Sequence, residues 1–330
     1  MITASNLACR AIRRLTPTTD ASPLGNSRLG GFRTWRLLKL ISWLSMSLEP
    51  MSPETVLDNL VFPEGPRWHD GELYFSDQHD RIVWAIAPSG KARRIADVPQ
   101  QPSGLGWLPD GTLQIVSMHD RHLLRLTPAG LTVVADLAPF APGYINDMVI
   151  DRHGRAYVGN FGFDLIAAEP VKSTVLLMVA LDGTVSVACD DVCFPNGTVI
   201  TPDGRTLLLA ETFAARITAF EIQPDGQLGN RRVFADLPGI HPDGTCLDAE
   251  GGLWVACAGG NKVIRVVDGG RVTHEIPLAG RHAYACMLGG ADRRDLYLCT
   301  AADYRPEITF ATRSGRIEVV RVDIPGAGLP

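Results

Sequence analysis

The feature that most constrains the fold of this chain is a sixfold internal repeat. Each copy contains a polar lead residue, a short apolar strand, a turn ending in glycine, and a second strand rich in Leu, Val and Tyr. The copies are spaced by 39, 43, 50, 47 and 42 residues and open at Glu64, Ser103, Asn146, Asn196, Asp243 and Ala285. A period of about 40–50 residues with strand–turn–strand content is typical of a β-propeller blade.

Each repeat continues into two further strands, so we expect four antiparallel strands in each blade. After the fourth copy, for example, residues 216–237 read as two strands joined by a Pro-Asp-Gly turn. Proline fixes φ, aspartate caps the turn backbone and glycine supplies a positive φ, which is hairpin chemistry. The sequence therefore predicts an all-β fold, a six-bladed β-propeller of four-stranded antiparallel blades, with little helix.

The sixth repeat lacks an outer strand on its C-terminal side. Its third strand is predicted over residues 316–323, close to the last residue of the sequence. Residues 54–60 precede the first repeat and belong to none of the six copies. We expect this N-terminal strand to pair beside the C-terminal strand and close the ring, since closure removes exposed strand edges.

Residues 1–50 differ in charge from the rest of the chain. They carry seven Arg and Lys against two acids, a balance of +5, whereas the remaining residues carry −10. Such asymmetry is typical of a tail or leader. Residues 40–48 faintly resemble a signal peptide, but no clean cleavage site follows, so export is the less favoured alternative. We therefore predict a basic extension at 1–50, disordered or not native, with Met46 or Met51 as natural starts, and a propeller domain at 51–330.

Composition limits the possible binding partners and the cellular location of the protein. The net charge of −5 and the lack of a basic face in the body argue against nucleic acid. No apolar run approaches the roughly 20 residues that span a bilayer, so we expect no membrane partner. The seven cysteines are odd in number and scattered, which favours a reducing, cytoplasmic location over a disulfide scaffold. We expect a small-molecule substrate and a monomer or weak homo-oligomer.

The lead residues are the candidate site. The first strand of each propeller blade lines the central channel, so these six residues should form a ring near one mouth. Four of them offer carboxylate or amide oxygens, which suit a hard divalent cation: Glu64, Asn146, Asn196 and Asp243. The alternative that Glu64 is a plain surface acid stays open. Asp147 follows Asn146 on the same strand, so we expect it to point into the blade in a structural role.

Two of these lead residues also have a competing interpretation as turns. Asn196 and Asp243 are each followed by glycine, and Asn-Gly and Asp-Gly are the strongest hairpin dipeptides. A glycine eight residues later, Gly204 or Gly251, already serves each repeat as its turn. A second tight turn would leave a strand of no length, so we favour the strand interpretation at both positions.

Loops joining the second and third strands should open on the same face as the lead residues. We expect five side chains of these loops to wall the entrance, namely His79, His119, Phe161, Phe163 and Phe213, although either histidine could instead be a solvated turn residue. The longest loop, residues 160–174, is a candidate lid. Four residues that precede lead positions are candidate ligand contacts, namely Tyr144, His241, His282 and Tyr284.

Several motifs in order resemble the gluconolactonase/regucalcin family, also called the senescence-marker-protein family. They are FPEGPRW, the Asn-Asp of YINDMVID, FPNGTVITPDGRTLLLAET, HPDGTCLDAEGGLWVA and ACMLGGADRRDLYLCTA, and the resemblance covers about residues 54–325. It implies a lactonase-type six-bladed propeller with one catalytic divalent metal in the channel. In that family the metal is held by the positions corresponding to Glu64, Asn196 and Asp243. The position of Asn146 contacts the substrate or a metal-bound water, which adds it to the candidate metal site.

The resemblance implies a metal-dependent hydrolase that opens a lactone by metal-activated water. Asp243 is the candidate catalytic base, with His241 behind it as an alternative proton acceptor, because a metal-bound carboxylate is a weak base. The predicted substrate-binding residues are Asn146, Ser103, Tyr144, His79 and His119. Calcium heads the possible metals, with zinc, manganese, magnesium and iron as alternatives.

One position departs from the family pattern. Members that act on sugar lactones often carry arginine two residues before the Asn of the Asn-Asp motif, and this chain has Tyr144 there. An aromatic ring in place of a cation, together with the entrance phenylalanines, indicates a less polar lactone or ester. Two alternatives stay open, a metal-dependent phosphotriesterase-type hydrolase and a non-catalytic ligand-binding propeller, because propellers serve both roles.

Overall fold

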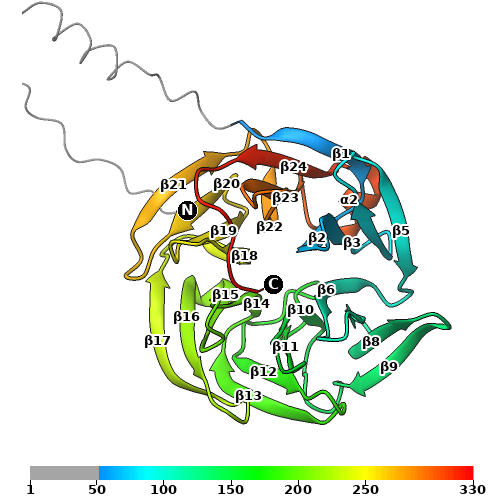
Figure 1. Ribbon diagram of the computed structural model, residues 1–330, viewed down its shortest axis with the longest axis vertical. Coiled ribbons are helices and arrows are strands. Elements are labelled where there is room, and N and C mark those ends of the chain that lie inside the picture. The colour runs from blue at the N-terminus through cyan, green and yellow to red at the C-terminus, as the bar shows by residue number, and fades with distance from the viewer. Residues whose placement is uncertain (1–51, 330) are drawn as a thin grey trace, which may run out of the picture. The chain divides into compact units, whose positions relative to one another are not determined.

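The computed structural model describes residues 52–329, so the interpretation of residues 1–50 lies outside the described part of the chain. Within residues 52–329 the chain forms 24 strands arranged as six four-stranded antiparallel sheets. The sheets follow one another around a central axis as the blades of a propeller (Figure 1). The predicted six-bladed β-propeller is therefore confirmed.

Blades one to five take all four strands in chain order from the centre outward, and blade six takes its first three in this way. The inner strands are β2 (Pro63–His69), β6 (Pro102–Trp107), β10 (Ile145–Ile150), β14 (Pro195–Ile200), β18 (His241–Leu247) and β22 (His282–Gly289). The second strands are β3 (Glu72–Asp77), β7 (Leu113–Ser117), β11 (Ala156–Asn160), β15 (Thr206–Glu211), β19 (Leu253–Ala258) and β23 (Asp295–Ala301). The third strands are β4 (Ile82–Ile86), β8 (His122–Thr127), β12 (Thr174–Val179), β16 (Arg216–Ile222), β20 (Lys262–Val266) and β24 (Gly315–Arg321). The outer strands of blades one to five are β5 (Ala92–Asp97), β9 (Gly130–Asp136), β13 (Val185–Val192), β17 (Leu228–Asp236) and β21 (Val272–Pro277).

The sixth blade takes its outer strand from the N-terminal side of the domain. Strand β1 (Glu54–Leu60) pairs antiparallel with β24, with Thr55 opposite Glu318 and Leu57 opposite Ile317. Val56 and Leu57 pack against the core cluster of blades five, six and one. The predicted closure of the ring is therefore confirmed, and β24 ends two residues before the predicted boundary.

The Asn-Gly and Asp-Gly dipeptides lie inside strands β14 and β18, as the repeat register predicted. Their glycines let neighbouring inner strands approach closely at the axis. A Cβ atom on Gly197 would lie 2.4 Å from the carbonyl oxygen of Asp243, and one on Gly244 would lie 2.4 Å from Cβ of Ala285. No larger residue fits at either position without moving backbone, so packing between blades explains these glycines.

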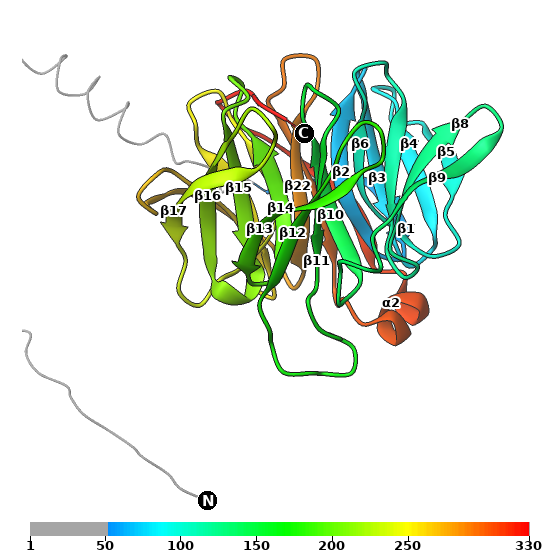
Figure 2. The ribbon, with the colours of Figure 1, turned by 90° about the horizontal axis from the view of Figure 1, so that it is seen from below.

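Helix is limited to two short segments within the described residues, as predicted. They are the 3₁₀ turn η1 (Thr212–Ala214) and the seven-residue helix α2 (Pro306–Thr312). Helix α2 lies in the loop between β23 and β24, and it projects from the same face as the β11–β12 loop (Figure 2). The sequence did not predict α2, because two turns are too short to show a 3.6-residue period.

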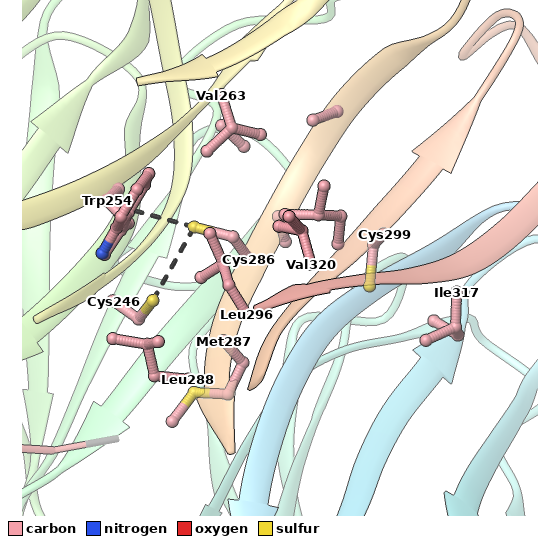
Figure 3. Close-up of a cluster of buried hydrophobic side chains, with 14 of the residues drawn as sticks. Cys246, Trp254, Val263, Cys286, Met287, Leu288, Leu296, Cys299, Ile317 and Val320 are labelled. Carbon is pink, nitrogen blue, oxygen red and sulfur yellow. Dashed lines mark hydrogen bonds between the residues drawn. The ribbon is translucent and has the colours of Figure 1, made fainter. Parts of the chain in front are cut away.

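The core is built from apolar side chains packed between neighbouring blades. Figure 3 shows the cluster that joins blades five and six, where Trp254, Leu296 and Cys286 lie together. Four cysteines are buried in these strands, as predicted, namely Cys246, Cys257, Cys286 and Cys299. The six cysteines of the described residues are all free thiols. No helix within residues 52–329 is both long and apolar enough to cross a bilayer.

The segment after β24 crosses the ends of the inner strands β14 and β18 and the turn that follows β22. The amide N–H of Gly326 donates to the carbonyl of Arg293 at 2.7 Å, that of Ala327 to Leu247 at 2.9 Å, and that of Leu329 to Ile200 at 2.9 Å. Leu247 and Ile200 are the last residues of β18 and β14, whereas the lead residues lie at the first ends of these strands. The C-terminal segment therefore ties blades four, five and six together at the mouth opposite the lead residues.

Candidate functional site

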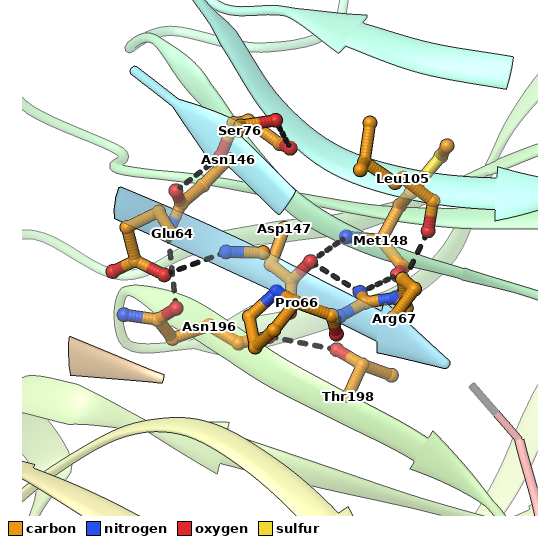
Figure 4. Close-up of polar contacts among 12 residues, drawn as sticks. Glu64, Pro66, Arg67, Ser76, Leu105, Asn146, Asp147, Met148, Asn196 and Thr198 are labelled. Atoms are coloured by element: carbon orange, nitrogen blue, oxygen red, sulfur yellow. Dashed lines mark hydrogen bonds and ion pairs between the residues drawn. The ribbon is translucent and has the colours of Figure 1, made fainter. Parts of the chain in front are cut away.

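A cavity of about 800 Å³ lies at the mouth where the inner strands begin. Glu64, Asn146 and Asn196 are each the second residue of an inner strand, and Asp243 is the third residue of β18. This common register brings the four side chains from blades one, three, four and five to one cavity, whose lining includes all of them. Figure 4 shows Glu64, Asn146 and Asn196 close to one another near the axis.

Ser103, the lead residue of blade two, lies behind this group. It is buried and does not belong to the cavity lining. Its Oγ accepts a hydrogen bond from Nε2 of Gln78 at 3.0 Å and donates to Oδ1 of Asn146 at 3.1 Å. Ser103 therefore orients the amide of Asn146.

The hydrogen-bond chain continues through the two amides. Nδ2 of Asn146 donates to Oδ1 of Asn196 at 3.1 Å, and Nδ2 of Asn196 donates to Oγ1 of Thr212 at 3.2 Å. The Thr212 hydroxyl donates in turn to the carbonyl of Pro242 at 2.8 Å. The chain links blades two to five and leaves Oδ1 of Asn196 with one unused lone pair, because an amide oxygen can accept two hydrogen bonds.

Two carboxylates in this cavity are buried without a cationic partner. Burial raises the pKa of Glu64 to about 8. Burial, and then repulsion from Glu64, raises the pKa of Asp243 well above its usual range. Neither side chain forms an ion pair with any residue of the described part of the chain. Two neighbouring carboxylates in a buried site repel each other unless a proton or a cation is shared between them.

Arg67, whose charge acts on Glu64, forms its ion pair with Asp147 instead. This pair corrects one prediction. Asp147 does not point into its own blade, because its Oδ1 accepts a hydrogen bond from Nη2 of Arg67 at 2.5 Å. Arg67 belongs to blade one and Asp147 to blade three, so this buried ion pair links two blades that are not neighbours in the ring. A register shift between Ile145 and Met148 breaks the alternation of β10, which explains why the alternation argument was wrong.

The predicted wall residues lie around the cavity with one exception. His79, His119, Phe161 and Phe213 belong to the lining, and so do Tyr144, His241, His282 and Tyr284. Phe163 does not. It is buried behind the wall, with its ring centroid 5.6 Å from that of Phe213. Residues 164–166 of the β11–β12 loop also line the cavity, while Ile166 is 61% exposed at its rim.

Several lining residues were missed by the sequence analysis. Phe62 and Phe194 occupy the same register, two residues before a lead residue, so the repeat itself could have identified them. The ring of Phe194 stacks on Phe161 with centroids 4.4 Å apart. Tyr304 and Phe310 line the cavity from the β23–β24 loop and α2. This loop lies outside the repeated pattern, so no signal in the sequence marked it.

His79 is the most enclosed histidine of the wall. Its ring stacks on Phe62 with centroids 4.7 Å apart, and its Nδ1 lies 2.7 Å from Oγ1 of Thr309 on α2. Burial lowers the pKa of His79 to about 4, with a smaller contribution in the same direction from the nearby His119. The ring is therefore neutral near pH 7.

The predicted metal ligands have the chemistry of a hard-cation site. No cluster of three or more His, Cys, Asp or Glu side chains suited to a metal occurs within residues 52–329, but two of the four predicted ligands are amides. Two unpaired buried carboxylates and the free lone pair of Asn196 supply oxygen donors and the negative charge that a divalent cation neutralises. The residues present therefore fit such an ion.

Comparison with known families identifies the same protein family as the sequence motifs. A model described as "SMP-30/Gluconolactonase/LRE-like region" matches residues 62–302. The chain belongs to this family. The match spans most of the propeller and includes all six lead residues, so the SMP-30/gluconolactonase/LRE-like region and the repeated blades are the same part of the chain.

Named relatives within the family are moderately similar to the chain. Regucalcin of Danio rerio is 31% identical over 52% of this chain and 59% of its own length. The 6-deoxy-6-sulfogluconolactonase of Pseudomonas putida is 30% identical over 56% of this chain and 64% of its own length. These alignments thus span about three fifths of each relative. L-arabinolactonase of Azospirillum brasilense is 27% identical over 72% of this chain and 80% of its own length.

Solved structures of the family share the fold. A calcium-binding protein, regucalcin, from Agrobacterium tumefaciens superposes with a TM-score of 0.72 at 24% identity, covering 85% of this chain and 97% of that one. A gluconolactonase from Xanthomonas campestris has a TM-score of 0.67 at 22% identity, covering 84% and 96% of the two chains. At these identities the likeness shows the propeller fold alone.

Proposed function

We propose that this chain is a metal-dependent hydrolase that opens a lactone ring in the channel-mouth cavity. The observation that carries the proposal is the pair of buried carboxylates, Glu64 and Asp243, which have no cationic partner within residues 52–329 and lie beside two oriented amides. A binding module has no need to bury two repelling carboxylates together. Relatives named as a 6-deoxy-6-sulfogluconolactonase and an L-arabinolactonase support lactone hydrolysis.

Each residue has a distinct role in this proposal. Glu64, Asn196 and Asp243 would hold one divalent cation, with Asn146 beside them. A cation bound there supplies Lewis-acid polarisation of a carbonyl and a lowered pKa for water. Asn146 orients the substrate through the Nδ2 hydrogen that Asn196 does not use, and Ser103 holds Asn146 in that orientation. Asp243 takes up the proton released on ring opening, with His241 at the cavity lining as the alternative acceptor.

The wall of the cavity favours a less polar lactone or ester than an aldonolactone. Tyr144 occupies the position at which sugar-lactone enzymes of the family often carry arginine, and it lies 4.5 Å from His119, centroid to centroid. Phe161, Phe194 and Phe213 continue the aromatic surface. Aromatic surfaces bind flat apolar groups well and offer few hydrogen-bond partners to sugar hydroxyls on that side of the cavity. The substrate is therefore a small molecule with an apolar portion.

We propose calcium as the first candidate for the ion, since carboxylate and amide oxygens are ligands that calcium prefers. The regucalcin of Agrobacterium tumefaciens, which shares the fold, is described as a calcium-binding protein. Zinc, manganese, magnesium and iron are the other ions to test. The free thiols of the described residues support a reducing, cytoplasmic location. We expect a monomer or weak homo-oligomer.

The test is a lactone panel run on chelator-treated protein with each divalent metal restored in turn, with proton release as the readout. The panel should include aldonolactones, alkyl and aryl lactones, and one phosphotriester. We expect hydrolysis of at least one lactone that chelation abolishes and metal restores. Metal-dependent turnover of the phosphotriester alone would favour that alternative hydrolase. Binding of these compounds without turnover of any would contradict the proposal.

A further inference from the structure

His79 is held in the cavity wall by groups from two distant parts of the chain. It lies in the loop between β3 and β4 of blade one and is 8% exposed. Its ring stacks on Phe62, with centroids 4.7 Å apart and planes 16° apart, and on Phe310 of α2, at 6.0 Å and 28°. This stacking fixes the plane of the imidazole, so its nitrogen atoms point in set directions.

The contacts of Thr309 determine which ring nitrogen of His79 carries the proton. Oγ1 of Thr309 lies 2.7 Å from Nδ1 of His79 and 3.2 Å from the carbonyl oxygen of Pro306. A hydroxyl has one proton to donate. Both contacts are hydrogen bonds only if that proton goes to the Pro306 carbonyl and Oγ1 accepts from Nδ1–H of His79. In the opposite arrangement two acceptor oxygens would face each other at 3.2 Å.

The other nitrogen, Nε2, then carries a lone pair in the cavity lining. Nε2 has no hydrogen-bond partner within residues 52–329, and His79 belongs to the lining. Because the ring is neutral near pH 7, Nε2 can accept a hydrogen bond but cannot donate one. Its stacked neighbours are both phenylalanines, so a ligand would meet this acceptor beside two apolar rings, with Gln78 and His119 as polar neighbours in the lining.

We propose that His79, positioned by Thr309, accepts a hydrogen bond from a substrate hydroxyl, so that the cavity selects lactones with a hydroxyl group on an otherwise apolar substituent. This inference rests on the proposed lactone hydrolysis and narrows its substrate class. A buried acceptor left unpaired by a substrate without that hydroxyl costs binding free energy, which is why sites of this kind discriminate well. Thr309 is a positioning residue, because it acts through His79.

The first test compares two lactones that differ by one hydroxyl on the same apolar substituent. His79→Phe preserves the aromatic stack and removes the acceptor. We expect the ratio of kcat/KM for the hydroxylated lactone to that for its deoxy analogue to fall by about 10–100-fold in this variant. Thr309→Val should lower the ratio in the same direction, and Thr309→Ser, which keeps the hydroxyl, should restore it. An unchanged ratio in His79→Phe overturns the inference.

The second test does not depend on turnover. In the full chain labelled with ¹⁵N-histidine, the His79 ring resonances are those that disappear in His79→Phe. We expect a protonated Nδ1 and an unprotonated Nε2 near pH 7, and a mixture of tautomers in Thr309→Val but not in Thr309→Ser. A protonated Nε2 overturns the inference whether or not any lactone is hydrolysed. Absence of turnover across the whole lactone panel, by contrast, counts against the proposed function.

Discussion

Glu64 and Asp243 determine the chemistry of the cavity at the scale of single residues. Their carboxyl groups are buried together, and Arg67, whose charge acts on Glu64, is bound to Asp147 and to backbone carbonyls. The protein therefore keeps two acidic groups at the end of its channel with no cationic partner within residues 52–329, and burial raises the pKa of both. Such an arrangement lowers stability by itself and is retained where a ligand compensates for it.

The first prediction concerns Asp243. Replacing it with asparagine keeps the size of the side chain and removes the charge and the proton acceptor. We expect kcat/KM to fall by about 10²–10⁴-fold, the usual contribution of one acid–base group. The melting temperature of the metal-free protein should not fall, because the repulsion with Glu64 is removed. Glu250→Gln, at an exposed site, is the control. A loss of activity below about 10-fold would contradict a direct role.

The second prediction concerns the pH dependence of stability that comes from His79. Its pKa is lowered to about 4 in the folded protein from 6.5, so between these values the unfolded chain binds more protons than the folded one. Stability from this residue is therefore complete above pH 6.5 and is lost as the pH falls towards 4. The free energy of unfolding falls by about 3 kcal/mol over this pH range, since each pKa unit corresponds to about 1.4 kcal/mol. Urea unfolding of the protein and of His79→Phe from about pH 7.5 to about pH 4 measures it, and parallel curves would refute it.

Side-chain direction was the least predictable property at this scale. The lead residues could be identified because the repeat places four oxygen-bearing side chains in one register. The direction of the Asp147 side chain could not be predicted, because the bulge in β10 breaks the alternation of side chains and has no signal in the sequence. His79 was predicted as a wall residue, but Thr309, which orients it, is 230 residues away in the chain. Nothing in a single sequence indicates such a pair.

Close packing of the inner strands controls the site at the scale of the secondary-structure elements. Gly197 in β14 approaches the backbone of β18 next to Asp243, so the distance between these strands also sets the distance between Asn196 and Asp243. The Asn-Gly and Asp-Gly dipeptides were correctly assigned to strands because each repeat already had its turn. The close approach itself was not predictable. Helix α2, with seven residues, was missed for lack of a period.

The third prediction tests this packing. In Gly197→Ala the added Cβ would lie 2.4 Å from the carbonyl oxygen of Asp243 and 2.6 Å from the amide nitrogen of Thr245, both backbone atoms. We expect a loss of about 1–3 kcal/mol in the free energy of unfolding, together with a marked loss of activity. Gly229→Ala is the matched control, because its Cβ meets only the flexible end of Gln223, at 3.2 Å. Equal stability of the two variants would contradict the explanation.

Closure of the ring joins the two ends of the domain at the scale of the whole propeller. Strand β1 joins the sixth blade from the opposite end of the domain, so the first and last strands of the described chain are hydrogen-bonded to each other. Blade number, strand order and closure could all be predicted, because a sixfold repeat with one strand missing allows few other arrangements. The conformations of the loops between β11 and β12 and between β23 and β24 could not be predicted, because these loops differ from blade to blade.

The fourth prediction tests closure. Leu57→Asp places a charge where the side chain packs against the core, whereas Thr55→Asp adds the same charge at an exposed position of the same strand. We expect Leu57→Asp to lower the free energy of unfolding by about 1–3 kcal/mol and to increase self-association through the loosened edge of β24. Denaturant unfolding and light scattering measure the two effects. Similar behaviour of both variants would mean that β1 contributes little to closure.

The ties between the inner strands have a further consequence, because the Arg67–Asp147 pair joins blades one and three and the C-terminal segment joins blades four, five and six at the far end. We expect the substrate to enter and the product to leave by the same aromatic mouth of the cavity. The hydroxy acid released by the proposed hydrolysis would then prevent the next substrate molecule from binding until it dissociates from the cavity. We therefore expect competitive inhibition by accumulated product.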